Sequence, residues 1–125
     1  MINMVDSSAW LEYFANSKNA KYYASAIENT KLLIVSPINI YEVYKKILIE
    51  RDEQSALQAI GIMQEAKVIE INSTLVIDAA KFSYKYKLPM ADSLIYTTAK
   101  FNNAILWTQD VDFKDLENVK YFKKI

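Results

Sequence analysis

The sequence predicts an α/β fold, a mainly parallel sheet with helices on both faces. Short apolar segments typical of buried strands alternate along the chain with longer segments of helical periodicity. Strands that are separated by helices need crossover connections, which make the strands parallel and cover both faces of the sheet. With 125 residues the chain has the usual size of one domain, so we expect residues 1–125 to form a single domain.

The first half of the chain begins with an apolar strand, residues 2–5. Residues 7–15 then follow at helical spacing, and a second helix is expected at residues 20–28. Residues 31–35 have the continuous apolar character of a strand that is buried on both faces. The Ser-Pro pair after that strand predicts a helix start, because proline is tolerated in the first turn, and the helix should end near residue 51.

The second half continues the alternation. A helix is expected at residues 55–66, and Ser73 or Thr74 is predicted to cap another that ends near residue 85. The break before Pro89 starts the helix at residues 90–101. Short apolar runs predict the remaining strands, at residues 67–71, 104–108 and, as a candidate last strand, 119–122.

The composition excludes several classes of chemistry. The chain has no cysteine, no histidine and one glycine. It therefore lacks thiol nucleophiles, histidine bases, ordinary zinc ligands and the glycine-rich loops that bind phosphates. Its formal net charge is zero, which argues against an architectural DNA-binding protein. Carboxylates remain available, and these are ligands that suit Mg²⁺ or Mn²⁺.

Two of the carboxylates follow predicted strands. Asp6 comes directly after the first strand, and Asp110 follows the strand at residues 104–108, with Asp112 close behind. In open parallel sheets, sites form outside the carboxyl ends of the strands. A helix N-cap for Asp6 and an ordinary loop aspartate for Asp110 are the structural alternatives.

Two further carboxylates interrupt apolar helical patterns. Glu42 lies on the side of its predicted helix opposite the apolar stripe, but its neighbours on that side, Ile38 and Ile49, are also apolar. Asp92 lies at the start of its predicted helix and is likewise surrounded by apolar residues. The alternatives are a mixed surface for Glu42 and a favourable helix-dipole interaction for Asp92. If a parallel sheet brings all four carboxylates to one edge, they would repel one another unless a cation neutralised them. The sequence therefore predicts a metal site.

At these residues the chain resembles the PIN-domain ribonucleases, especially the VapC-type toxins of toxin-antitoxin pairs. The resemblance spans essentially the whole chain and depends on short motifs in a specific order, which are Val5-Asp6-Ser7-Ser8, Ile40-Tyr41-Glu42-Val43, Leu88-Pro89-Met90-Ala91-Asp92-Ser93-Leu94-Ile95 and Leu106-Trp107-Thr108-Gln109-Asp110-Val111-Asp112-Phe113. It implies a three-layer α/β/α sandwich around the parallel sheet.

The resemblance also implies the site and its chemistry. The catalytic and metal-binding carboxylates would be Asp6, Glu42, Asp92 and Asp110, with Asp112 taking or sharing the last role. Ser7 and Thr108 match positions whose hydroxyls support these carboxylates. One or two Mg²⁺ or Mn²⁺ ions would activate a water that attacks RNA in line and leaves 5′ phosphates. Gln109 departs from the family, in which many members have a basic residue there.

The implied partners are an RNA substrate, an antitoxin protein and a second copy of the chain in a homodimer. Lysines could hold the phosphates of RNA, and tyrosines between them could stack on unpaired bases. The side chains available for these contacts are Lys45, Lys46, Lys81, Lys85, Lys87 and Lys100, with Tyr84 and Tyr86 interleaved. A solvated helix face with core tyrosines is the structural alternative for each of them.

Two alternatives to a ribonuclease stay open at this point. One is a PIN-like module that binds RNA or protein without cleavage, and the other is a phosphoacceptor receiver domain. A receiver needs an aspartate at the end of its central strand, whereas the candidate strand at residues 67–71 is followed by Asn72. The sequence has neither a signal peptide nor an apolar run long enough to span a membrane, so we expect a soluble, cytoplasmic protein.

Overall fold

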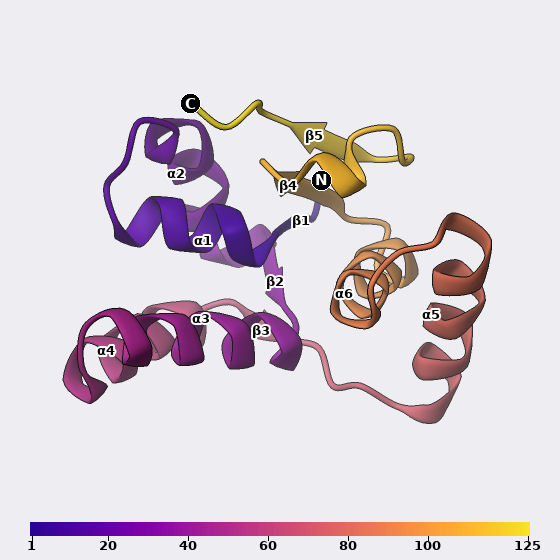
Figure 1. Cartoon of the computed structure of the whole chain (residues 1–125), viewed down its shortest axis with the longest axis horizontal. Helices are drawn as coiled ribbons and strands as arrows, with labels where there is room; N and C mark the ends of the chain where they lie inside the picture. The colour runs from indigo at the N-terminus through magenta and orange to yellow at the C-terminus, as the bar shows by residue number, and fades with distance from the viewer.

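A computed structural model describes all 125 residues of the chain (Figure 1). Its sheet has 5 strands in the order β3-β2-β1-β4-β5, and every neighbouring pair is parallel. The strands are β1 (Asn3–Val5), β2 (Leu33–Val35), β3 (Lys67–Val68), β4 (Ile105–Thr108) and β5 (Val119–Tyr121). The predicted parallel sheet is therefore confirmed, and β1 lies at its centre.

The α-helices cover both faces of this sheet. They are α1 (Ser7–Phe14), α2 (Ala20–Glu28), α3 (Pro37–Glu50), α4 (Glu53–Met63), α5 (Ser73–Tyr86) and α6 (Met90–Phe101). In Figure 1, α1 to α4 lie on one side of the strands, and α6 lies on the other side with α5 beyond it. This arrangement is the three-layer α/β/α sandwich that the resemblance implied. No helix combines the length and the hydropathy that a bilayer crossing requires.

The two halves of the core follow from the alternation of side chains along the strands. Val5 packs with Trp10 of α1 and Tyr23 of α2, in the larger core cluster. Met4, its neighbour on β1, packs with Ile95 of α6 in the second cluster. Successive side chains of a strand point to opposite faces, so β1, β2 and β4 each contribute to both cores. This explains why β2 is apolar without interruption.

Several boundaries differ from the predicted ones for local reasons. The helix expected at residues 55–66 begins at Glu53, because Asp52 accepts a hydrogen bond from the Ser55 main chain at 2.7 Å. The cap of α5 is Asn72, whose side chain accepts from the Leu75 N–H at 2.9 Å, so the prediction of Ser73 or Thr74 was wrong.

Two of the predicted strands are shorter than expected by more than one residue. The run expected at residues 67–71 pairs with β2 only at Lys67–Val68. Residues 31 and 32 belong to a short 3₁₀-helix, Thr30–Leu32, that leads into β2. Apolar character alone does not show where strand pairing starts and stops, because the pairing partner decides that.

The strand order determines where a site can form. The chain proceeds from β1 outward through β2 and β3, and then returns to the opposite side of β1 as β4 and β5. The order therefore reverses between β1 and β4, and ligands of open α/β sheets bind in the crevice at such a point. Asp6 directly follows β1, and Asp110 lies two residues after β4. A receiver domain has a different strand order, which removes that alternative.

Candidate metal centre

Three aspartates gather at this edge of the sheet. Asp92 lies in the first turn of α6, and Asp110 and Asp112 belong to the turn after β4. Each offers one carboxylate oxygen, and these oxygens lie within 4.8 Å of one another. The main chain fixes part of this turn, because the Asp112 N–H donates to Asp110 Oδ1 at 2.9 Å. Both Asp110 and Asp112 therefore join Asp92, rather than one replacing the other.

Asp6 is buried beside this group, at 3% exposure. The hydroxyls of Ser8 and Thr108 both donate to its Oδ2, at 2.7 and 3.0 Å. Asp6 is the N-cap residue of α1, as the structural alternative predicted, but its side chain makes no capping bond to that helix. No side chain donates to Oδ1, which leaves that oxygen available for a ligand.

Glu42 is half-buried on α3 and is held from α1. The Ser7 hydroxyl donates to Glu42 Oε1 at 2.7 Å. Glu42 and Asp6 lie outside the tight group of three aspartates, although their charges reach Asp92. The structure thus places hydroxyls beside two acids, Ser7 next to Glu42 and Thr108 next to Asp6.

The carboxylates perturb one another. Burial, together with the charges of the four other acids, raises the pKa of Asp92 to about 7. Burial also raises the pKa of Asp6 to about 6, although the hydroxyls of Ser8 and Thr108 favour its charged form. The ion pairs of the molecule are Lys46–Glu50 and Lys81–Asp78, so no lysine or arginine pairs with any of these five acids.

The donor set fits a hard divalent cation. Asp6 Oδ1, Glu42 Oε2 and Asp110 Oδ2 accept no side-chain hydrogen bond, whereas the second oxygen of each carboxylate is held by the protein. Oxygen ligands and uncompensated negative charge are what Mg²⁺ and Mn²⁺ require. These residues can therefore hold such an ion, and the protein itself supplies no other counter-charge.

Two side chains of the site were not predicted. Ser8 donates to Asp6, and Asn39 Nδ2 donates to the Ser7 hydroxyl at 2.9 Å. A signal for Asn39 exists in the sequence, because it precedes Glu42 by three residues and so shares its face of the helix. A single polar residue at that spacing is too common to identify a contact with a different helix.

Gln109, which departs from the family pattern, has a structural contact inside the fold. It is buried, and its Oε1 accepts from Asn19 Nδ2 at 3.1 Å. Asn19 also donates to the main-chain oxygen of Lys123, at 3.0 Å. The side chain of Asn19, at the start of α2, thus joins Gln109 to the C-terminal segment.

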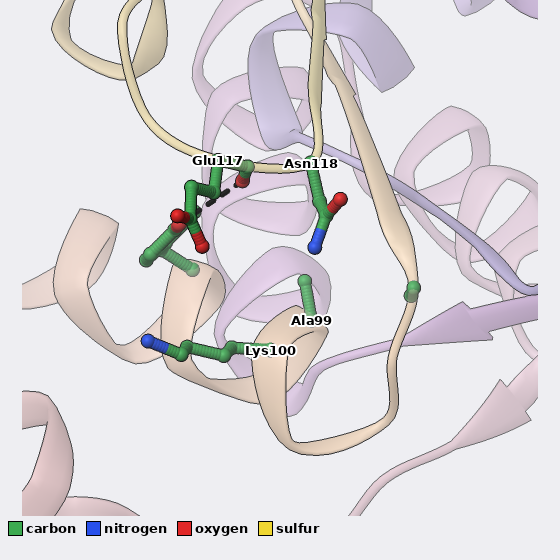
Figure 2. Close-up of a pocket in the computed structure, with 6 residues that line it drawn as sticks. Ala99, Lys100, Glu117 and Asn118 are labelled. Atoms are coloured by element: carbon green, nitrogen blue, oxygen red, sulfur yellow. Dashed lines mark hydrogen bonds between the residues drawn. The ribbon is translucent and has the colours of Figure 1, made fainter.

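Lys100, one of the candidate RNA-binding lysines, lies at the opposite ends of the strands from the acids. It lines a small cavity of about 10 Å³ with Ala99, Glu117 and Asn118 (Figure 2). Glu117 and Asn118 precede β5, so this cavity is at the amino ends of the strands. This volume is about the minimum that one water molecule needs, and the Tyr96 hydroxyl donates to the Glu117 carbonyl beside it at 3.0 Å.

Thr108→Val is expected to weaken the site without changing its shape. The hydroxyl donates to Asp6 and also accepts from the Asp110 N–H at 2.9 Å, so valine leaves the Asp110 N–H unpaired and Asp6 with the Ser8 hydroxyl as its one side-chain donor. Loss of such a supporting contact lowers metal affinity or activity by about 10- to 100-fold. Titration with Mn²⁺ measures this effect.

The matched control is Thr98→Val. Thr98 is equally buried, but its hydroxyl donates to the Leu94 carbonyl in its own helix. We expect this control to bind Mn²⁺ like the unmodified protein. Equal affinities for both variants would show that Thr108 does not support the acids.

Comparisons with known proteins agree with this architecture. The model of the PIN domain family matches residues 4–119. A toxin-antitoxin complex from Klebsiella pneumoniae contains a chain with a TM-score of 0.82 at 21% identity, and the match covers 98% of this chain and 99% of that chain. No curated protein sequence matches.

Two further solved structures share the fold. VapC20 of Mycobacterium tuberculosis, described as a sarcin-ricin loop cleaving toxin, has a TM-score of 0.78 at 15% identity, with 91% of this chain and 94% of that chain covered. VapBC-1 from nontypeable Haemophilus influenzae has a TM-score of 0.72 at 21% identity, with 98% of each chain covered.

Proposed function

Because the chain belongs to the PIN domain family, we propose that it is a metal-dependent endoribonuclease and the toxin of a type II toxin-antitoxin pair. One observation supports the nuclease function most directly. Five acids gather around the reversal point of the strand order, and none of them has a protein cation as its partner. We also propose that residues 1–125 form a single domain and act in the cytoplasm. RNA would bind at the edge of the sheet where the acids lie.

The proposed ligands are Asp6, Glu42, Asp92, Asp110 and Asp112. These residues would hold Mg²⁺ or Mn²⁺, which would supply an acidified water and stabilisation of the negative charge that develops on a phosphodiester. The protein contributes fixed positions, because hydrogen bonds hold one oxygen of Asp6, Glu42 and Asp110. Ser7 and Thr108 keep two of these acids in place.

The expected products follow from the proposed attack by water. Histidine ribonucleases use the neighbouring 2′ hydroxyl and give cyclic phosphates, but this chain has no histidine to act as their general base. If water attacks and the 3′ oxygen leaves, the new ends are a 5′ phosphate and a 3′ hydroxyl. The chemistry of the ends therefore distinguishes the two classes of mechanism.

The structural neighbours support the choice of substrate and partner. One is described as a toxin that cleaves the sarcin-ricin loop, and others are toxin-antitoxin complexes. We extend both properties to this chain as part of the proposal, with RNA as the substrate and an antitoxin protein as the inhibitor. We also propose a homodimer, which sedimentation can test.

A panel of end-labelled single-stranded RNAs tests the nuclease function. We expect cleavage with Mg²⁺ or Mn²⁺, no cleavage with EDTA, and 5′ phosphates at the new ends. Cleavage that persists in EDTA or gives cyclic phosphates would contradict the proposal. Retention of RNA without cleavage in any metal would instead favour the alternative of a binding module.

A further inference from the structure

We propose that Asn39 is a positioning residue that acts through Ser7 to hold Glu42 in the metal centre. This inference depends on the proposed function of that centre. Asn39 lies in the first turn of α3 and is completely buried. Its amide contacts no acid directly, so any effect on Glu42 passes through the Ser7 hydroxyl.

The hydrogen bonds of Asn39 determine the orientation of its amide. The Ser36 N–H donates to Asn39 Oδ1 at 3.1 Å, and a main-chain N–H can only donate. The oxygen of the amide therefore faces Ser36, and the NH₂ group faces Ser7. Nδ2 donates to Ser7 Oγ at 2.9 Å.

This orientation fixes the direction of the next hydrogen bond. An amide NH₂ group has no lone pair to offer, so the Ser7 hydroxyl must accept from Asn39. Its single proton is then free for Glu42, whose Oε1 lies at 2.7 Å. The chain of bonds runs in one direction, from Asn39 through Ser7 to Glu42.

The hydrogen bond from Ser7 holds one oxygen of Glu42 and leaves the other free. Glu42 has several rotatable bonds and is only half-buried, so a fixed position costs conformational entropy. The bond from Ser7 fixes Oε1 and leaves Oε2 without a protein donor. Without Asn39 the Ser7 hydroxyl can rotate and donate elsewhere, and Glu42 is held less often.

Asn39 also contributes to a helix cap, and the two roles can be separated. Its Oδ1 forms half of the capping box of α3, and the other half is Ser36. A role in capping alone predicts a lower melting temperature with no effect on the metal. A positioning role predicts weaker metal binding that depends on Ser7.

Calorimetric titration of Mn²⁺ into four proteins tests the inference, namely the unmodified chain, Asn39→Ala, Ser7→Ala and the double variant. We expect each single substitution to weaken binding by about tenfold. The double variant should bind no more weakly than Ser7→Ala, because Asn39 has no path to Glu42 once Ser7 is gone. Melting temperatures are recorded in parallel.

Two more variants keep the test decisive if Asn39→Ala folds poorly. Asn39→Asp retains an acceptor for Ser36 and adds a charge that favours the helix and attracts cations. It would accept from Ser7 and turn that proton away from Glu42, so we expect weaker Mn²⁺ binding in a folded protein. Asn72→Ala removes the cap of α5 and should lower the melting temperature without changing Mn²⁺ affinity.

The outcomes separate this inference from the proposed function. Unchanged affinity in the Asn39 variants, or an equal further loss when Asn39→Ala is added to Ser7→Ala, would overturn the positioning role and leave the metal centre intact. Failure of the unmodified protein to bind Mn²⁺ would overturn both the metal centre and the role of Asn39.

Discussion

Asp92→Asn is expected to reduce RNA cleavage by about a thousandfold or more and to raise the melting temperature of the metal-free protein. Asp92 belongs to the tight group of three aspartates, and its pKa is raised to about 7 by burial and by the four other acids. Losing several kcal/mol of transition-state stabilisation corresponds to about three orders of magnitude in rate. Removing the charge also removes its repulsion by the neighbouring acids.

Initial rates with a fixed RNA and a thermal melt in EDTA at pH 8 measure both effects. Asp78→Asn is the matched control, because Asp78 is an aspartate on the outer helix α5 that forms a long 3.9 Å ion pair with Lys81. We expect the control to cleave RNA at the normal rate. A folded Asp92→Asn protein that retains a tenth of the activity would exclude Asp92 from the proposed catalytic site.

Metal binding is expected to stabilise the protein strongly at pH 8 and hardly at all at pH 5. The pKa of Asp6 is raised to about 6 and that of Asp92 to about 7, each from 3.8, mainly by burial. The folded chain therefore binds protons more tightly than the unfolded chain. The stability from these two groups is complete below pH 3.8 and is lost as the pH rises through 6 and 7.

Metal binding has the opposite pH dependence, because a carboxylate must lose its proton to act as a ligand. At a hundredfold excess over Kd, a bound ion contributes about 2.7 kcal/mol, or roughly 10 °C in melting temperature for a domain of this size. Melts with Mn²⁺ and with EDTA at both pH values measure the difference. An equal shift at pH 5 and pH 8 would contradict the assignment of these acids as ligands.

Local patterns in the chain were enough to predict the class of fold and the candidate acids. Strand and helix periodicities depend on neighbours close in the chain, so the pattern placed β1, α6 and β4 within a residue or two of their true bounds. Asp6 and Asp110 could be singled out because they follow strands. The absence of histidine and cysteine left carboxylates as the available ligands without any knowledge of the structure.

The order of the strands and the contacts within the site depend on packing between distant segments. Thr108 donates to Asp6 across 102 positions of the chain, and Ser7 joins Glu42 across 35. No local pattern encodes such pairs, because they form only when β1 and β4 pair and α1 packs on α3. The same packing brought Asp112 into the group of acids and gave Asn39 its contact with Ser7. Local periodicity therefore predicted which acids were candidates for the metal site. The packing of distant segments decided which of their oxygens accept hydrogen bonds from the protein and which remain free.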